Sequence, residues 1–305
     1  MKLKNSISVK DLLYSIKFKG NVIGDSGTLI VGLNDDFSVC PNDLTWATSS
    51  AILLSLIKKG FPLTVITNHT NIPKTDSIVL IYTQDPIAVF EQCAMHLNVL
   101  PDMPPIIGEN TFVHDSAIIG NNVRIGRGCI IGPNVVIYSN TIIGDNVSIA
   151  SNSTISAPPF YSQRNNDFSF IHRQIYGNVC IGDNVQIGSS CVIDKGIVGT
   201  TSIGKGTRLG NLVEIGHDVI IGNYCSLAAQ VAIAGYVEIG DFCDFWGRAG
   251  VVNRIRIAPH TTVYATSVVT KNTQPGDDLC GFPAIDRKQY WKQIAELRSI
   301  SKHQL

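Results

Sequence analysis

The best candidate for acid–base chemistry is a histidine inside a regular six-residue pattern. His217 occupies the third place of its hexad, where side chains are expected to face outward. An imidazole with an ordinary pKa of about 6.5 takes up a proton near neutral pH and could serve as a general base. Gly235 follows eighteen residues later, one full coil if three hexads make a coil, so both residues should reach the same bound molecule. The competing interpretation is that His217, one of seven histidines, is only a solvated corner residue.

Aromatic residues gather between residues 158 and 176, where the six-residue pattern is interrupted. Phe160 and Tyr161 in this loop could stack on a nucleotide base or clamp a sugar face, because an aromatic ring offers a large flat apolar surface. His172 in the same loop could contact the substrate. The alternative is that the aromatic side chains pack the loop against another subunit and that His172 is solvated.

The six-residue pattern itself predicts the architecture. Aliphatic residues recur at every sixth position from Ile107 to Ile155, often followed by glycine, and small or β-branched residues stand four places further on. This is the hexapeptide repeat of a left-handed parallel β-helix, a β-solenoid whose coils satisfy each other's backbone hydrogen bonds. Glycine is expected at the corners because it tolerates turn conformations that other residues resist.

The repeat is broken twice. It stops at residues 157–174, resumes at Ile175, and then skips ten residues instead of six between Ile193 and Ile203 before running on to Val269. Loops that leave a regular scaffold often carry function, although harmless surface insertions are the alternative.

Three regions follow from these patterns. Residues 1–103 lack the repeat and predict an α/β domain, with helices at 9–17, 49–59 and 86–97 and apolar strands at 63–67 and 77–82. Residues 104–282 form the β-helix with its loop at 157–174. Residues 283–305 predict a C-terminal helix that covers the last coil or packs on a neighbouring subunit.

The composition argues for a small-molecule partner. Lys plus Arg and Asp plus Glu are balanced at 24 each, so no net charge draws the chain to nucleic acid or to a membrane surface. The N-terminus has no uninterrupted apolar run like that of a signal peptide, and no stretch reaches the roughly 18 apolar residues of a membrane span. The eight scattered cysteines fit buried reduced thiols in a cytoplasmic protein.

A known family combines these features. An α/β head, a hexapeptide prism with a loop in mid-helix and a terminal helix together resemble UDP-3-O-(3-hydroxyacyl)glucosamine N-acyltransferase, the N-acylating enzyme of lipid A synthesis. The resemblance covers nearly the whole chain. Its strongest segment is residues 193–222, which read IDKGIVGTTSIGKGTRLGNLVEIGHDVIIG and are similar to the family's IDRGA stretch with its following Asn and catalytic His.

The resemblance assigns roles to individual residues. It implies that His217 is the general base, that the N–H of Gly235 is an oxyanion donor, and that Asn211 belongs to the catalytic group. Asp194 and Lys195, in the segment that matches IDRGA, are expected to bind the substrate. It also implies a homotrimer in which the outward face of the prism lines a cleft between two subunits, so that these groups converge between protomers.

The resemblance also predicts the ligands. The donor would be acyl-CoA or acyl carrier protein, with no metal and no tightly bound cofactor. Residues 267–284 are similar to the last coil of many hexapeptide acyltransferases, which binds CoA, so Lys271 and Arg248 are candidates for phosphate contacts. Trp46 lies near the region where related enzymes stack the uracil of a nucleotide sugar.

Two motifs depart from the family. Arg254 replaces a second active-site histidine of the family's NGH segment, and residues 157–163, APPFYSQ, replace its DGFGY loop. Arg254 becomes a further candidate for donor binding. These changes favour N-acylation of a dTDP-linked amino deoxysugar for surface polysaccharide over the lipid A substrate, which stays as the alternative.

Three rival functions use a similar prism. A γ-type carbonic anhydrase needs several histidines around a metal, but His217 and His260 are 43 residues apart and fall on different corners. A simple sugar O-acetyltransferase would seldom need the large head domain. A non-catalytic scaffold would be indifferent to the loss of His217.

Overall fold

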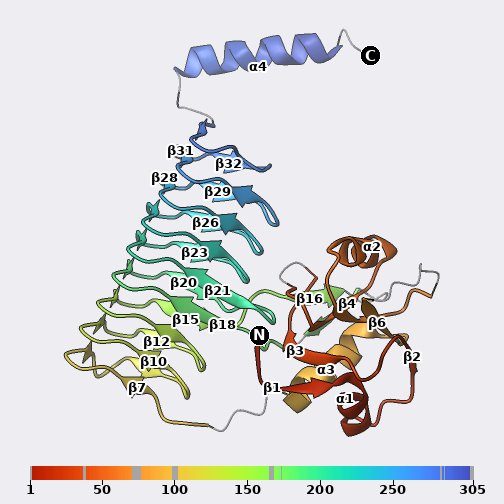
Figure 1. Cartoon of the computed structure of the whole chain (residues 1–305). Helices are drawn as coiled ribbons and strands as arrows, with labels where there is room; N and C mark the ends of the chain where they lie inside the picture. Colours follow the sequence, from red (N-terminus) through yellow and green to blue (C-terminus); the bar gives the residue numbers. More distant parts are fainter. Residues whose placement is uncertain are drawn as a thin grey trace.

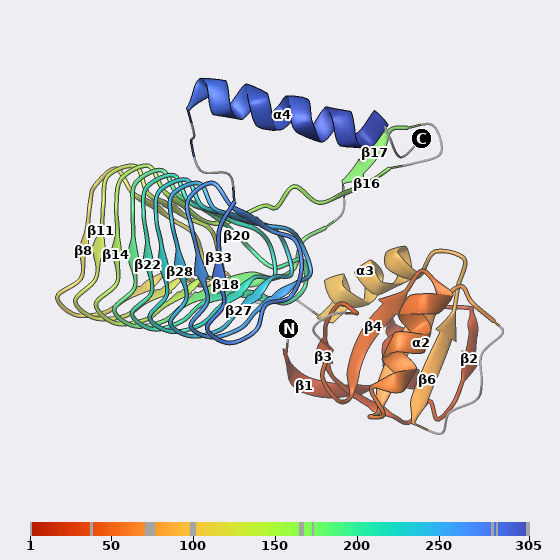
Figure 2. The same cartoon turned by 90° about the horizontal axis from the view of Figure 1, so that it is seen from above.

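The computed structural model describes residues 2–36, 39–70, 77–97, 102–164, 168–172, 174–281, 284 and 286–302. Figure 1 shows a tall solenoid, a head domain beside its lower half, and a helix near its upper end. The view from above in Figure 2 looks down the stacked coils. The structure confirms the predicted left-handed parallel β-helix with an N-terminal α/β domain and a C-terminal helix.

The head domain is a six-stranded sheet with three helices. Its strand order is β1-β3-β4-β5-β6-β2, with antiparallel strands at both edges and parallel strands between them. The expected helices and the two expected strands are all present, whereas the first four strands escaped the sequence analysis. The elements are β1 (Lys2–Ser8), α1 (Val9–Ser15), β2 (Asn21–Ile23), β3 (Leu29–Leu33), β4 (Asp43–Ala47), α2 (Ser50–Lys58), β5 (Leu63–Thr67), β6 (Ile78–Tyr82) and α3 (Pro86–Leu97).

The solenoid has three parallel faces of eight, nine and eight strands. The first face holds β7 (Ile106–Ile107), β10 (Arg124–Ile125), β13 (Ile142–Ile143), β18 (Asn178–Ile181), β21 (Thr200–Ile203), β24 (Ile220–Ile221), β27 (Glu238–Ile239) and β30 (Arg256–Ile257). The second holds β8 (Phe112–Val113), β11 (Ile130–Ile131), β14 (Ser148–Ile149), β19 (Gln186–Ile187), β22 (Arg208–Leu209), β25 (Ser226–Leu227), β28 (Asp244–Phe245), β31 (Thr262–Val263) and β33 (Asp278–Leu279). The third holds β9 (Ile118–Ile119), β12 (Val136–Ile137), β15 (Thr154–Ala157), β20 (Val192–Asp194), β23 (Glu214–Ile215), β26 (Ala232–Ile233), β29 (Gly250–Val251) and β32 (Val268–Val269).

Three corners join these faces. In each coil the first corner leads from the first face to the second, the second corner from the second face to the third, and the third corner from the third face to the next coil. Strands pair in register with the coil above, as Ile125 with Ile143 and Ile215 with Ile233. The repeating aliphatic residues therefore stack in one continuous buried column inside the prism.

The glycines that follow the strands have a different cause from the one expected. The left-handed conformation at the corners is taken mostly by other residues, including Asn134 and Asn146, with φ of 56° at both. At Gly126, by contrast, an added Cβ would lie 2.5 Å from the carbonyl oxygen of Gly144 in the next coil. These glycines are needed because neighbouring coils approach each other closely, and not because of a positive φ.

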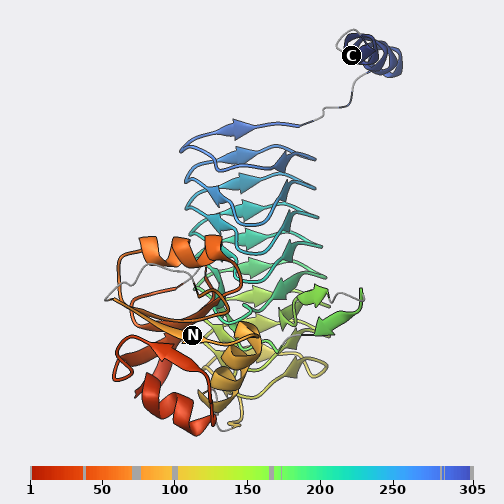
Figure 3. The same cartoon turned by 90° about the vertical axis from the view of Figure 1, so that its right-hand side faces the viewer.

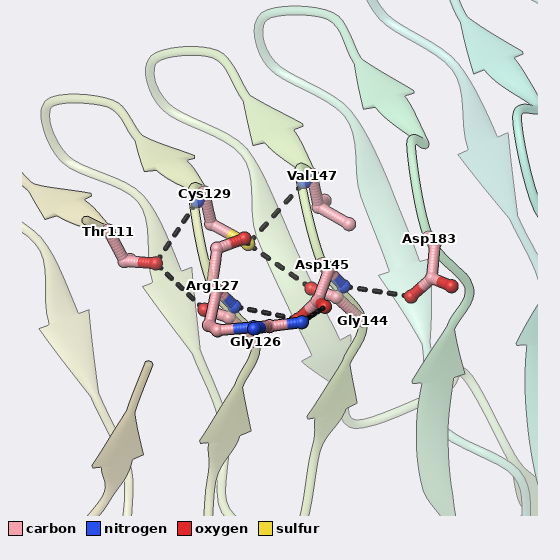
Figure 4. Close-up of polar contacts among 8 residues, drawn as sticks. All are labelled: Thr111, Gly126, Arg127, Cys129, Gly144, Asp145, Val147 and Asp183. Atoms are coloured by element: carbon pink, nitrogen blue, oxygen red, sulfur yellow. Dashed lines mark hydrogen bonds and ion pairs between the residues drawn. The ribbon is translucent and has the colours of Figure 1, made fainter. Parts of the chain in front are cut away.

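Polar side chains join successive coils at the first corner (Figure 4). Thr111 Oγ1 donates to the carbonyl oxygen of Gly126 at 2.7 Å and accepts the N–H of Cys129 at 3.0 Å. The Asp145 carboxylate accepts the N–H of Arg127 at 2.8 Å and pairs with its guanidinium at 3.1 Å. Backbone groups that the strands leave free are thus satisfied at the turns.

Several of these corner positions hold cysteine. Five of the eight cysteines are buried, as expected, but Cys40 and Cys280 are exposed and Cys180 is half-buried. The Cys129 thiol lies 3.2 Å from the carbonyl oxygen of Gly144 in the next coil. Cys225 makes the same kind of contact at the first corner, and Cys191 makes it at the second corner. A small thiol at this position fills the corner and replaces the hydroxyl of Thr111.

Both breaks in the repeat lie at the third corner and contact the head domain. The first carries a small hairpin of β16 (Ser162–Arg164) and β17 (Phe170–His172), which projects to the side in Figure 3. From the second, Ile197 and Val198 are buried in one apolar cluster with Trp46 and Phe90 of the head. The breaks are therefore the joint between the two domains and not harmless insertions.

The C-terminal helix α4 (Arg287–Lys302) stands apart from the last coil in Figure 1. Its Tyr290 and Trp291 are both exposed. Of the two roles expected for this helix, covering the last coil is not seen among the described residues, and packing on a neighbouring subunit stays a prediction. Among the described residues, no helix is both long and apolar enough to cross a bilayer.

The core predicts which substitutions destabilise the prism. Ile142 and Ile143 are neighbours on β13 with exposed fractions of 44% and 2%. Replacing Ile143 by Ala should cost about 2–5 kcal/mol in unfolding free energy because it leaves a cavity in the column. Ile142→Ala should change stability by less than about 1 kcal/mol. Urea denaturation of both variants checks this expectation, and equal losses would contradict the inward and outward assignment.

Candidate active site

His217 stands at the third corner with a buried carboxylate beside it. Its Nδ1 lies 3.0 Å from Oδ2 of Asp218, and the two side chains are 17% and 1% exposed. A carboxylate oxygen only accepts hydrogen bonds, so Nδ1 carries the proton and Nε2 of the neutral ring keeps its lone pair. The pair therefore leaves Nε2 available as the proton acceptor.

The backbone fixes the carboxylate that orients the ring. Asp218 Oδ2 also accepts the N–H of Ile197 at 2.8 Å, and the Asp218 N–H donates to Thr201 Oγ1 at 2.8 Å. Both partners belong to the second break in the repeat. An added Cβ on Gly196 would lie 2.6 Å from Asp218 Oδ1, so the glycine makes room for the carboxylate. The skipped register below His217 therefore builds the support for its imidazole.

Gly235 lies directly above His217, as the eighteen-residue spacing predicts. An added Cβ on Gly235 would be 2.6 Å from His217 Nε2, so only glycine fits against this edge of the ring. The Gly235 N–H donates to no group in the described part of the chain, whereas its carbonyl oxygen accepts the N–H of Arg254 at 3.2 Å. One base nitrogen and one unpaired amide thus share the same corner.

Two tyrosines and an arginine form the wall around the imidazole. Tyr236 packs edge-on with its centroid 4.8 Å from that of His217, and Tyr161 of the first break does so at 5.9 Å. Arg254 lies over the Tyr236 ring at 4.5 Å and reaches Asp36 of the head at 3.8 Å. Burial raises the pKa of Tyr236 above its usual range, so its hydroxyl stays protonated. The head domain therefore closes one side of the site.

Asp194 adds a second titratable group one coil below His217. Burial raises the pKa of its carboxyl to about 6, the charge of His217 opposes this shift, and Glu214 adds to it. Burial also lowers the pKa of the neighbouring Lys195, whose N–H donates to the carbonyl oxygen of Ala157 at 2.9 Å. Both residues lie at the corner of His217, consistent with the expected substrate contacts.

Asn211 does not lie beside His217. It stands at the second corner, where its Oδ1 accepts the N–H of Ser189 at 2.8 Å, and the width of the third face separates it from His217. Arg248 lies two coils higher at this second corner, and its Nε donates to Gln230 Oε1 at 2.6 Å. A single chain therefore does not bring Asn211 together with His217 and Gly235.

The remaining expected residues are scattered. Trp46 is 9% exposed and packs on Phe90 at a ring distance of 4.4 Å, so its faces lie within the joint between the domains. Phe160 is 94% exposed beside the buried end of the loop. Lys271 is exposed at the third corner of the last complete coil, and the side chain of His172 lies outside the described residues.

Two further candidates for sites lie away from His217. His260 stands at the first corner and stacks on Phe242 at 5.1 Å, and among the described residues no three His, Cys, Asp or Glu side chains gather to hold a metal ion. A cavity of about 660 Å³ opens at the foot of the solenoid, lined among others by Lys4, Met103 and Arg124. Its lining includes Asn122 and Asn140 at the third corner, but these lie in coils below both breaks, and the lining contains neither His217 nor the residues that contact it.

The sequence analysis missed Asp218, Tyr236 and Asp36. Asp218 was visible as a carboxylate next to the histidine, at a left-handed corner position (φ 56°) where lower coils carry asparagine. Tyr236 stands at the matching position one coil above it. No sequence signal placed Asp36 here, because the docking of the head decides its position.

The raised pKa of Asp194 predicts how stability depends on pH. A carboxyl whose pKa is higher in the folded state than its unfolded value of about 3.9 favours folding most below pH 4, and this contribution is lost as the pH rises through about 6. Asp194→Asn removes the penalty, so at pH 8 it should raise the melting temperature by about 1–3 °C. At pH 4 the variant and wild type should melt alike. A lower melting temperature of the variant at pH 8 would contradict the burial argument.

Comparisons with known proteins agree with this fold. The bacterial transferase hexapeptide (six repeats) model matches residues 104–138, 128–157 and 200–235. Two solved UDP-N-acetylglucosamine acyltransferases share the fold. One, from Campylobacter jejuni, has a TM-score of 0.52 and 23% identity over 56% of this chain and 65% of its own. The other has a TM-score of 0.52 and 24% identity over 67% of this chain and 78% of its own.

Relatives in sequence carry a more specific name. A probable UDP-3-O-acylglucosamine N-acyltransferase 2 of Arabidopsis thaliana is 43% identical over 114 residues, 37% of each chain. UDP-3-O-acylglucosamine N-acyltransferase 1 of Sulfurimonas denitrificans is 37% identical over 114 residues, 37% of this chain and 36% of its own. The resemblance expected from the sequence is thus confirmed, but the match spans only about a third of these relatives' length and not nearly the whole chain. Residues 104–157 and 200–235 of the solenoid match bacterial transferase hexapeptide repeats, and over about a third of their length the relatives to which the chain is similar are UDP-3-O-acylglucosamine N-acyltransferases.

Proposed function

We propose that this chain is an N-acyltransferase that moves an acyl group from a thioester to the amine of a nucleotide-linked amino sugar. The observation that carries the proposal is the third corner, where His217 Nε2 lies against the position that a side chain of Gly235 would occupy and Nδ1 is held by buried Asp218. Thioester aminolysis needs a base for the amine proton and a donor for the oxyanion. These two groups meet both needs.

The reaction follows from this arrangement. The amine attacks the thioester carbonyl while His217 Nε2 takes a proton from the attacking nitrogen. The Gly235 N–H donates to the oxyanion of the tetrahedral intermediate, and Asp218 stabilises the imidazolium. The C–S bond then breaks, and the sulfur leaves with the proton that His217 held. A placed base of this kind contributes roughly 10² to 10⁴ in rate.

The acceptor is a nucleotide-linked amino sugar. The relatives' names contain UDP-3-O-acylglucosamine, which supports a UDP-linked glucosamine as acceptor. Arg254 and the divergent loop around Phe160 and Tyr161 line or flank the site, and this supports the dTDP-linked amino deoxysugar as second candidate. The donor is acyl-CoA or acyl carrier protein, and we place the reaction in the bacterial cytoplasm, where such thioesters are made.

A homotrimer completes the site. Asn211 and Arg248 lie at the second corner, whereas His217 and Arg254 lie at the third, with the third face between them. In a cyclic trimer each chain presents one edge of this face to one neighbour and the other edge to the other neighbour. The second corner of one protomer would thus meet the third corner of the next, and Lys271 would flank the same cleft.

Loss of the base tests the proposed activity. His217→Ala should lower kcat by about 10² to 10⁴ and leave the oligomer and the melting temperature unchanged. The assay pairs acetyl-, 3-hydroxybutanoyl- and 3-hydroxymyristoyl-thioesters with UDP- and dTDP-linked amino sugars. His260→Ala is the matched control, because that histidine lies at another corner. Wild-type protein inactive in all pairs, or a fully active His217→Ala variant, refutes the proposal.

Mixing two inactive variants tests the shared site. Asn211→Ala and His217→Ala chains, each inactive alone, are unfolded together, refolded at equal amounts and assayed. If each site takes Asn211 from one protomer and His217 from the next, about a quarter of the sites in random trimers are intact. About a quarter of wild-type activity should return. If mixed trimers recover no activity, Asn211 and His217 do not act together across two protomers.

A further inference from the structure

The amine of the acceptor loses two protons in this reaction, and His217 accounts for only one. Near neutral pH an aliphatic amine with a pKa of about 8 is mostly an ammonium ion, which has no lone pair for attack. One proton must leave before the C–N bond forms, and a second leaves during bond formation. His217 returns its proton to the departing sulfur, so the first proton must go to another acceptor, either water before binding or a group in the site.

Asp194 lies where that acceptor is needed. Strand β20 ends at Asp194 and pairs with β23 above it, with Ile193 opposite Ile215, so Asp194 is level with Gly216 and one coil below the His217 corner. Its side chain is half-buried, and the charges of both His217 and Glu214 act on its carboxyl. The carboxyl therefore faces the same corner as the base.

The other acidic groups nearby differ from Asp194 in their surroundings. Asp35 of the head is fully buried, and its charge acts on Tyr236. Asp218 is buried and holds His217 Nδ1 and the N–H of Ile197. Asp36 faces Arg254 at 3.8 Å. Glu214 is exposed on the third face, and its strand partner is Val192. Lys195, the cation next in sequence, cannot accept a proton from ammonium while it is charged.

We propose that Asp194 is a second catalytic acid–base residue, which binds the acceptor's ammonium group and takes its first proton. The proton passes from nitrogen to the Asp194 carboxylate and leaves a neutral amine and a carboxylic acid. The amine then attacks, His217 takes the second proton and gives it to the sulfur, and Asp194 releases its proton to water. Ammonium and thioester thus yield amide, thiol and one proton.

The environment of the carboxyl suits this role. Burial raises its pKa to about 6, so at neutral pH it is mostly ionised and still a stronger base than an exposed carboxylate. A buried carboxylate is costly for folding unless it binds a cation. An ammonium ion from the substrate supplies that cation.

The inference rests on the proposed function and is tested by the pH dependence of kcat/KM. Wild type, Asp194→Asn and Glu214→Gln are assayed from pH 5.5 to 9 with the donor and the UDP- or dTDP-linked amino sugar that wild type uses best. Without Asp194 only the free amine reacts, so the Asp194→Asn defect should be about tenfold or more at pH 7 and within about threefold at pH 9. Glu214→Gln removes a nearby charge and should show no such recovery with pH.

The outcomes separate the two proposals. An Asp194→Asn defect of the same size at pH 7 and pH 9, or a Glu214→Gln variant with the same pH-dependent defect, overturns the role of Asp194 and leaves the acyltransferase intact. Unchanged activity of Asp194→Asn at pH 7 overturns it as well. Wild-type protein without transfer to any amino sugar refutes the acyltransferase and this inference together. Thermal melts of each variant show that the fold is kept.

Discussion

The structure depends on in-register hydrogen bonding between successive coils of the solenoid. Each strand pairs with the strand eighteen residues further on wherever the repeat is unbroken, so one coil dictates the position of the next. Backbone groups left unpaired inside such a column would cost free energy, and the chain therefore keeps a strict period. This constraint stacks Gly235 on His217 and Tyr236 on Asp218, so the proposed catalytic corner is built by the coil itself.

The two breaks in the period are as important as the period itself. Both occur at the third corner, below His217, and residues of both breaks pack against the head domain. The second break also supplies the Ile197 N–H and the Thr201 hydroxyl that hold Asp218. Leaving the ladder costs backbone pairing, which the burial of Ile197 and Val198 against the head offsets. The second break therefore both docks the head and holds the Asp218 carboxylate that contacts His217.

The sequence predicted the parts of the molecule that periodicity controls. The coil, the inward aliphatic column and the stacking of Gly235 on His217 all follow from counting residues by six and eighteen. The explanation of the glycines was wrong, because Gly126 is needed for close approach of coils and not for a left-handed turn. The first four head strands were missed because they are short or lie beside polar turns. Asp36 could not be placed, since its position depends on how two separately folded units pack.

A single chain holds Asn211 and His217 at different corners of the prism. The repeat places the two residues one hexad apart, and a hexad is one face of the prism, so they must stand at different corners. Their convergence therefore requires a second copy of the chain. The same geometry explains why the cations divide, with Arg248 at one corner and Arg254 and Lys271 at the other. In the proposed trimer, a donor that contacts both sets would lie across a boundary between protomers, with its thioester near the Gly235 amide. Assembly would then be a condition of catalysis and not only of stability.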